Sequence, residues 1–376
     1  ISETSGESTN NTSTYLITDD VQPKFTGKVG MRNFNEQKAL TEDKLQDIHE
    51  SLNQRPADDV ESKQPKHLKV TLMKHQLQAL AFMEWREAAQ KPRGGLLADD
   101  MGLGKTLTAI SLIMKQMQTY ESRPEDESDS EDEEREQWIA QGRRDLRAGG
   151  TLVICPATLM KQWEYEVKTK VKRGALEICV FHGASRPTKS RDLARYDVVI
   201  TTYQIIVSEH KNSGCIFGLR WDRIILDEGH VIRNCKSKQA EAVCSLEAKH
   251  RWVMTGTPVQ NKEFDIFSTM KFLRCTPFDD IRYWKTWIEV RGRDNSPRLQ
   301  ALLKSILLRR TKAQLIESGQ VESLPNKTFE LVMVELNTAE RLVYNKVLAY
   351  SQEMFAEYMQ QNQEKHNNYT YDKAQL

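Results

Sequence analysis

The stretch Gly94–Thr106, GGLLADDMGLGKT, decides the fold class of this chain of 376 residues. It reads as a short apolar strand, a loop with two glycines and the start of an amphipathic helix at Lys105. Such a loop is typical of phosphate-binding sites, because glycine lets the backbone wrap a phosphate and the helix N-terminus offers unpaired N–H groups. Asp99 stands where the usual G-x-x-x-x-G-K-[ST] pattern has its first glycine, so the motif needs support from a second one.

The loop supplies the side chains that a nucleoside triphosphate with Mg²⁺ requires. The Lys105 ammonium can reach the β- and γ-phosphates, and the Thr106 hydroxyl can hold the Mg²⁺ ion. The predicted nucleotide-binding residues of the loop are Asp99, Asp100, Met101, Gly102, Leu103, Gly104, Lys105 and Thr106.

A second motif, IILDEGH over Ile224–His230, brings two adjacent carboxylates to the end of an apolar strand. Asp227 is predicted to hold the Mg²⁺ shell, and Glu228 to orient and deprotonate the attacking water. A solvated acidic turn would explain this motif alone, but the two motifs in this order favour a nucleotide hydrolase. The predicted catalytic residues are Lys105, Asp227 and Glu228, with Thr106 and Asp227 as metal ligands.

Apolar strand-like runs alternate with helical patterns through most of the chain. The strand-like runs are GGLLA, TLVIC, LEICVF, DVVITTY, RIILDE and RWVMTGT, and helices are predicted near residues 105–118, 159–171 and 236–246. This alternation predicts an α/β fold in which helices cover both faces of a parallel sheet. Ligands bind at the carboxyl ends of the strands in such sheets, and the glycine loop lies there.

Composition narrows the class of protein. A hydrophobic content of 39% over 376 residues is enough for about two domains. The six cysteines lack the spacing of a zinc module or a disulfide framework, and no apolar run reaches the roughly 18 residues of a membrane span. We therefore expect a reducing compartment, no membrane partner and, because the chain does not start with Met, a fragment of a longer protein.

The net charge of +1 hides an acidic segment, residues 121–136, with ten acidic and two basic residues. The remainder of the chain carries a basic surplus, which is compatible with a polyanionic partner. A solvated disordered loop is the favoured interpretation of the acidic segment. The alternative is that it mimics the charge of DNA and competes for a basic groove, with Ser128 and Ser130 as phosphorylation sites.

With these motifs the chain resembles the Swi/Snf-type branch of helicase superfamily two, whose members move along duplex DNA by using ATP. The resemblance spans Val70 to about Lys312 and rests on HQLQALAFM, DDMGLGKT, LVICPATLMKQWEYEV, VVITTY, LDEGH, VMTGTPVQN and LLRRTK, in family order. It implies a RecA-like P-loop lobe with ATP and Mg²⁺, and it adds Gln76 on the adenine side. An acidic residue ahead of MGLGKT is common in this branch, whereas Asp100 and Gly229 depart from its usual Glu and Ala.

The resemblance also implies roles for residues outside the two nucleotide motifs. The residues expected to couple the nucleotide site to DNA are His230, Thr255, Gly256 and Thr257. The residues expected to follow a DNA backbone are Pro156, Ala157, Lys161, Gln162, Thr201, Thr202, Arg309 and Arg310. Because these groups suit phosphate contacts, no base readout is expected.

Two further segments are similar to one branch of the family, the RNA polymerase II transcription termination factors of the lodestar type. These are QKPRGGLLADDMGLGKTLT and DEGHVIRN. The similarity implies an enzyme that removes the polymerase elongation complex and transcript from double-stranded DNA, in the nucleus. Alternatives are a DNA-repair or chromatin-remodelling translocase, a P-loop ATPase that ignores DNA, and a non-catalytic nucleotide- or DNA-binding module.

The predicted domains follow from the resemblance. Residues 1–66 are expected to be mostly disordered with a short helix near 36–52, and residues 67–312 to form the first RecA-like lobe, with an acidic insert at 121–147 and a helical extension at 278–312. Residues 313–376 are expected to begin a second lobe, with a strand at KTFELVMVELN and a helix capped by Asn337 and Glu340. Since Arg341 is the one arginine after Lys312, we expect the chain by itself to hydrolyse ATP negligibly.

Overall fold

The computed structural model describes residue 21 and residues 27–89, 92–121, 146–256, 263–288, 297–322 and 328–373. Two compact units divide the chain, Ile1–Glu322 and Ser323–Leu376. Most of the predicted acidic insert, residues 122–145, lies outside the described residues, as does Thr257.

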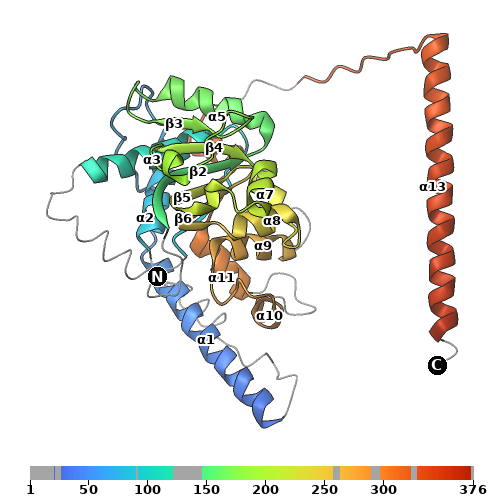
Figure 1. Ribbon diagram of the computed structural model, residues 1–376, viewed down its shortest axis with the longest axis horizontal. Coiled ribbons are helices and arrows are strands. Elements are labelled where there is room, and N and C mark those ends of the chain that lie inside the picture. The colour runs from blue at the N-terminus through green and yellow to red at the C-terminus, as the bar shows by residue number, and fades with distance from the viewer. Residues whose placement is uncertain are drawn as a thin grey trace, which may run out of the picture. The chain divides into compact units, whose positions relative to one another are not determined.

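The first unit is built on one sheet in which every described pairing is parallel, with the strand order β3-β4-β2-β5-β6-β1-β7 (Figure 1). The strands are β1 (Gly94–Leu97), β2 (Arg147–Cys155), β3 (Ile178–Val180), β4 (Val198–Thr202), β5 (Leu219–Leu226), β6 (Glu247–Met254) and β7 (Leu307–Leu308). The first six correspond to the six apolar runs of the sequence, so the predicted parallel sheet is confirmed.

Helices cover both faces of this sheet, as predicted. Side chains alternate along β2, so that Leu152 and Ile154 join one hydrophobic core while Val153 and Cys155 join the other. The second core is covered by α2 (Lys74–Ala88), α3 (Lys105–Glu121) and α5 (Ala157–Lys170). The first is covered by α7 (Tyr203–Lys211), α8 (Lys238–Cys244), α9 (Glu263–Leu273) and α11 (Pro297–Ile306). Short elements complete the unit: α6 (Ser190–Leu193), η2 (Cys215–Gly218), η3 (Gly229–Ile232), α10 (Ile281–Tyr283), η4 (Trp284–Ile288) and α12 (Lys312–Glu317).

The N-terminal helix α1 is longer than the sequence predicted. It spans Lys28–Asn53, whereas the pattern indicated a helix near 36–52 in a mostly disordered segment. Leu45 and Ile48 are buried in the first core, and the ring of Phe34 stacks on Trp287 with centroids 5.4 Å apart. Packing against α11 and η4 thus stabilises polar turns of α1 that no apolar repeat marks.

The predicted helical extension at 278–312 contains a strand. Leu307 and Leu308 form β7, which pairs in parallel with Leu96 and Leu97 of β1, and the N–H of Ala98 donates to the carbonyl of Leu308 at 2.8 Å. Without β7, the backbone groups on the side of β1 that faces away from β6 would have no partner strand. Pairing with these groups explains why a strand of two residues forms here.

The second unit differs from its prediction in one respect. Residues 328–337 form no strand, because an extended segment needs a neighbouring strand and none lies in the described part of this unit. The helix α13 (Thr338–Lys373) follows, and its predicted cap is confirmed by reciprocal hydrogen bonds between Asn337 and Glu340 of 2.9 and 3.0 Å. No described helix has the length and apolar character that crossing a membrane would require.

Candidate nucleotide site

The predicted phosphate loop, residues 98–104, joins β1 to α3 at the carboxyl edge of the sheet. Gly102 and Gly104 have φ values of +84° and +80°, a region that side chains other than glycine disfavour. A Cβ at Gly104 would also lie 2.1 Å from Nε2 of Gln76. Both glycines are therefore required by the shape of the loop.

The Lys105 ammonium lies inside this loop. Its Nζ donates to the carbonyl oxygens of Asp99 at 2.6 Å and Asp100 at 3.1 Å. Burial lowers the pKa of Lys105, while the nearby carboxylates, Asp99 and Glu228 first among them, oppose that shift. Neutral carbonyls are weaker partners for an ammonium than phosphate oxygens are, so the group is available to an incoming anion.

Residues at the start of α2 hold the loop from outside. Nε2 of His75 lies 3.0 Å from the carbonyl oxygen of Leu103, and Nε2 of Gln76 donates to the same oxygen at 3.4 Å. Oε1 of Gln76 accepts from the N–H of Met73 at 3.0 Å. Gln76, predicted on the adenine side, thus has a loop-supporting contact, and His75, which begins the HQLQALAFM motif but was given no role, also supports the loop.

Asp99 binds an arginine from the far end of the unit. Its carboxylate accepts from Nη2 of Arg310 at 2.5 Å, from Nε at 3.1 Å and from the Arg310 backbone N–H at 2.9 Å. Arg310 also donates to the carbonyl of His75 at 2.8 Å. The acidic residue in place of the first glycine therefore joins the phosphate loop to the segment after β7. The Arg310 guanidinium, predicted to contact DNA, is engaged within the lobe and its side chain is 16% exposed, so its contact with DNA stays a prediction.

Asp100 also binds the segment after β7. Its N–H donates to the carbonyl of Arg310 at 3.1 Å, and its Oδ2 accepts from the N–H of Lys312 at 3.0 Å. The Lys312 side chain lies against Gly102, where a Cβ would be 3.4 Å from Nζ. The LLRRTK motif includes this lysine, but its place beside the phosphate loop was not predicted, because it stands 212 positions after Asp100.

The second motif lies at the end of β5, as predicted. Oδ2 of Asp227 accepts from Nε1 of Trp163 at 2.7 Å, and Oδ1 accepts from the N–H of Glu228 at 3.0 Å. Burial raises the pKa of Asp227, and the hydrogen bond from Trp163 opposes that shift. Trp163 is buried, and its hydrogen bond orients the predicted metal ligand.

Glu228 adopts a left-handed backbone conformation, with φ 50° and ψ 53°. Strain of this kind costs about 1–3 kcal/mol and is concentrated at functional sites. The turn is held by the Tyr203 hydroxyl, which donates to the carbonyl of Asp227 at 2.8 Å. Nδ1 of His230 lies 3.2 Å from Oε2 of Glu228, so the predicted coupling histidine is beside the predicted base.

Gly229 stands where the family branch usually has alanine, and the difference has a steric cause. A Cβ at this position would lie 2.2 Å from Cγ1 of Val253, a buried residue of β6. The turn after β5 therefore packs so closely on β6 that alanine does not fit without movement.

Of the other predicted coupling residues, Thr255 is buried just after β6, and Gly256 lies against the phosphate loop. A Cβ at Gly256 would be 2.9 Å from Cγ of Met101. The start of the TGT segment thus touches the loop directly. Thr257 is not among the described residues.

The predicted DNA-contacting residues separate into two groups. Ala157, Lys161, Gln162 and Arg309 are exposed, and Pro156 is half-buried. Thr201 and Thr202 are buried, and both hydroxyls are used within the lobe. The Thr201 hydroxyl donates to the carbonyl of Phe181 at 3.1 Å, and the Thr202 hydroxyl caps α7 by accepting from the N–H of Ile205. The prediction that these two hydroxyls contact DNA is corrected; they hold the strand end in place.

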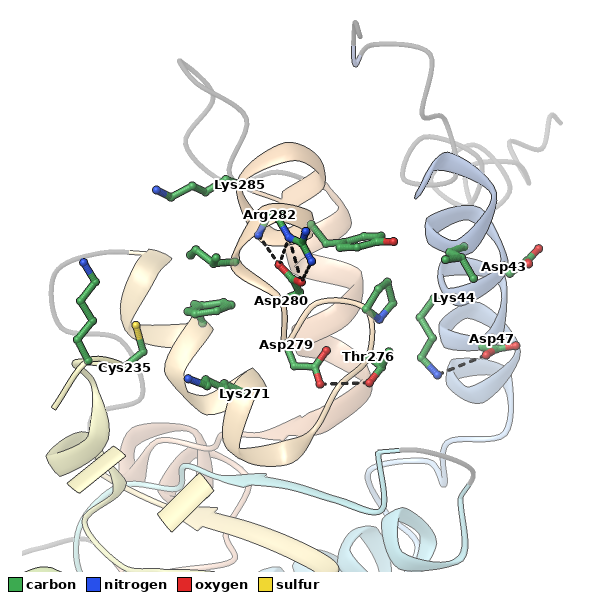
Figure 2. A pocket seen from close by; sticks show the side chains of 16 residues that line it. Asp43, Lys44, Asp47, Cys235, Lys271, Thr276, Asp279, Asp280, Arg282 and Lys285 are labelled. Atoms are coloured by element: carbon green, nitrogen blue, oxygen red, sulfur yellow. Dashed lines mark hydrogen bonds and ion pairs between the residues drawn. The ribbon is translucent and has the colours of Figure 1, made fainter. Parts of the chain in front are cut away.

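A cavity of about 1210 Å³ lies elsewhere, between α1 and the segment from α9 to η4 (Figure 2). Its lining shares no residue with the predicted nucleotide site. Two of its cations are paired, Lys44 with Asp47 at 3.3 Å and Arg282 with Asp280 at 2.7 Å. The predicted nucleotide site is the phosphate loop, which has the positive-φ glycines and the ammonium that suit a phosphate, and this cavity is separate from it.

Comparison with known proteins bears on the family of the chain rather than on single residues. A family model described as an SNF2-related domain matches residues 75–375. The chain is 49% identical over 362 residues to transcription termination factor 2 of Drosophila melanogaster, covering 94% of this chain and 34% of that protein. It is 34% identical over 318 residues to the DNA repair protein RAD5A of Arabidopsis thaliana, covering 76% of this chain and 31% of that protein.

A solved structure of the Sulfolobus solfataricus SWI2/SNF2 ATPase core in complex with double-stranded DNA superposes with a TM-score of 0.51. The two chains are 28% identical, and the match covers 67% of this chain and 47% of the other. The parallel sheet with its helices therefore has the RecA-like fold of such cores. The chain spans about a third of the length of the curated relatives named above.

Proposed function

The chain belongs to the SNF2-related family, and from this premise we propose that it is the nucleotide-binding lobe of an ATP-dependent translocase on double-stranded DNA. The observation that carries the proposal is the meeting of two motifs at one sheet edge. Lys105 lies inside the phosphate loop, and the left-handed turn at Glu228 stands at the end of β5.

The residues present fit a bound ATP with Mg²⁺. The Thr106 hydroxyl and the Asp227 carboxylate are hard oxygen ligands, which Mg²⁺ prefers in combination with water and phosphate oxygens. When bound, the ion would neutralise charge on the β- and γ-phosphates. Trp163 would keep one oxygen of Asp227 oriented in the absence of the ion.

Hydrolysis requires a base and a cation from this lobe. Glu228 would take a proton from water while the water oxygen bonds to the γ-phosphorus and the bond to the β-phosphate oxygen breaks, which yields ADP and phosphate. Lys105 would leave the carbonyls of Asp99 and Asp100 and bind the phosphate oxygens. Charge on the transferring group also needs arginines, which we propose come from a second RecA-like lobe of the same protein.

DNA contact is proposed at the exposed edge formed by Ala157, Lys161 and Gln162, with Arg309 as a further candidate. A lysine, an amide and free N–H groups suit a sugar–phosphate backbone rather than bases. His230 and Gly256 are proposed to carry the nucleotide state to this edge, since one lies beside Glu228 and the other beside Met101.

Removal of an RNA polymerase II elongation complex and its transcript from the template, in the nucleus, is the finer function we propose. The 49% identity to transcription termination factor 2 favours it over repair, for which the identity to RAD5A is 34%. Strand exchange or remodelling without release of transcript would favour the repair alternative.

The test uses a longer form that includes the second lobe. We expect phosphate release stimulated by duplex DNA, release of transcript from a stalled polymerase complex, and loss of both in Lys105→Ala. The 376-residue chain assayed beside it should bind nucleotide but hydrolyse it negligibly, because Arg341 is the one arginine after Lys312. Hydrolysis by the longer form that is indifferent to DNA would contradict the translocase proposal.

A further inference from the structure

Lys312 places a second ammonium group at the phosphate loop. Its Nζ and Cε lie 3.4 and 3.7 Å from the point where a Cβ on Gly102 would stand. Gly102 is exposed and belongs to the part of the loop whose backbone is shaped to surround an anion. Lys312 therefore brings a side chain from the segment after β7 next to the phosphate loop.

The backbone of Lys312 is held in place by several independent contacts. The Lys312 N–H donates to Oδ2 of Asp100 at 3.0 Å, and β7, four residues earlier, pairs with β1. Thr311 caps α12 through a capping box, since its hydroxyl accepts from the N–H of Gln314 at 3.2 Å and Oε1 of Gln314 accepts from its N–H at 2.9 Å. The position of this lysine is thus determined by the fold rather than by its own side chain.

The Lys312 ammonium has no bonding partner among the described residues. Nζ of Lys312 makes no hydrogen bond or ion pair with any of them, although two carboxylates are near. Asp99 is occupied by Arg310, and Asp100 accepts from the Lys312 backbone rather than from Nζ. Lys105 belongs to the same loop, and an anion with several negative charges could attract both ammonium groups.

We propose that Lys312 is a nucleotide-binding residue that contacts the phosphate chain of the bound nucleotide from the segment after β7. This deepens the proposed function and rests on it. Lys105 would bind the phosphates from the start of α3, and Lys312 would bind them from the segment after β7. Because Lys312 follows Arg310, which is tied to Asp99, nucleotide binding would also tighten the segment that leaves the lobe.

The test measures nucleotide affinity of the 376-residue chain with ATP, ADP and adenosine. We expect Lys312→Ala to weaken ATP and ADP binding about tenfold, as befits a partly exposed charge-assisted contact, and to leave adenosine binding unchanged. Lys312→Arg should restore most of the affinity, whereas Lys312→Gln, which keeps a polar side chain without the charge, should not. Lys304→Ala is the matched control, since Lys304 is an exposed lysine of α11, and should bind like the unaltered chain.

The outcomes distinguish the inference from the proposed function. Equal loss for adenosine and ATP, or full affinity in Lys312→Gln, would overturn the phosphate contact while leaving the proposed function intact. A loss of affinity for a short DNA duplex with ATP binding unchanged would also overturn it, since the lysine would then serve DNA. Failure of the unaltered chain to bind any nucleotide, with no effect of Lys105→Ala, would overturn both. Melting temperatures within error of the unaltered chain confirm that the variants are folded.

Discussion

Asp222 lies within β5 and Asp227 directly follows that strand, and the two aspartates have opposite surroundings. Asp222 near the amino end accepts from Nε2 of Gln116 at 2.5 Å and lies 3.8 Å from Nδ1 of His250. Burial alone would raise the pKa of Asp222, but His250 and Arg223 outweigh it and hold that pKa well below its usual range. Asp227, directly after the carboxyl end, has a pKa raised by burial that its hydrogen bonds do not offset.

The neighbours of the two aspartates extend the contrast. Beside Asp222, the fully buried Arg223 forms two 2.6 Å hydrogen bonds to Glu87, which also accepts from Nε1 of Trp252 at 2.9 Å. Beside Asp227, the Glu228 carboxylate has a buried Oε2 that lies 3.2 Å from Nδ1 of His230 but makes no hydrogen bond of good geometry within the described residues. The carboxylates of Asp222 and Glu87 are held by cations and hydrogen bonds, whereas the Glu228 carboxylate retains capacity for a substrate.

Replacing the predicted base should have the largest effect of any change at this strand. We expect Glu228→Gln in the two-lobe form to lower DNA-stimulated hydrolysis by about 10²–10⁴-fold, because no other group would take the proton from water. Nucleotide binding and melting temperature should stay unchanged. Phosphate release and nucleotide titration measure the two quantities, and hydrolysis at the unaltered rate would show that Glu228 is not the base.

A change at Arg223, beside Asp222, should lower the stability of the fold rather than the rate of hydrolysis. Arg223→Ala would leave Glu87 charged and buried without its cation, so we expect a loss of about 3–5 kcal/mol in the free energy of unfolding. Urea denaturation measures it. Adding Glu87→Leu should recover much of the loss, because it removes the uncompensated charge. A double variant as unstable as the single one would contradict this account.

Gly229→Ala tests the close packing of the site on β6. The new methyl would meet Val253, so we expect a loss of about 1–3 kcal/mol in unfolding free energy. If the methyl acts by displacing the Glu228 turn, Gly229→Ala should also lower hydrolysis in the two-lobe form. Adding Val253→Ala should then restore that hydrolysis. Full stability and activity of Gly229→Ala alone would show that the turn moves freely.

The smallest expected effect is a change in pH dependence. The pKa values of Asp222 and Glu87 are lowered by folding, so their stabilisation is present above their unfolded values and is lost as pH falls through the folded ones. Asp222→Asn should cost about 1 kcal/mol at neutral pH and flatten the decline of stability below about pH 4. Denaturation midpoints between pH 7 and pH 3 measure this, and parallel curves for the two chains would contradict it.

Local patterns predicted the parts of the site that are continuous in sequence. The phosphate loop, the carboxylates after β5 and the helix cap at Asn337 are each specified within about ten residues by backbone and capping chemistry. The Asp99–Arg310 pair was missed because it joins residues 211 positions apart, and Arg310 alone resembles any basic surface residue. Thr201 looked accessible because polar ends of strands are often exposed, and nothing local showed that Phe181 would cover it.

The position of β1 in the sheet determines when the phosphate loop can form during synthesis. Its neighbours β6 and β7 begin at Glu247 and Leu307, so β1 emerges from the ribosome long before either partner exists. Contacts at such sequence separation form slowly, and an unpaired apolar strand is prone to aggregation while it waits. A nascent chain that ends before Arg310 has the whole GGLLADDMGLGKT motif and lacks the residues that clamp Asp99 and Asp100, so it should depend on chaperones until the clamp is translated.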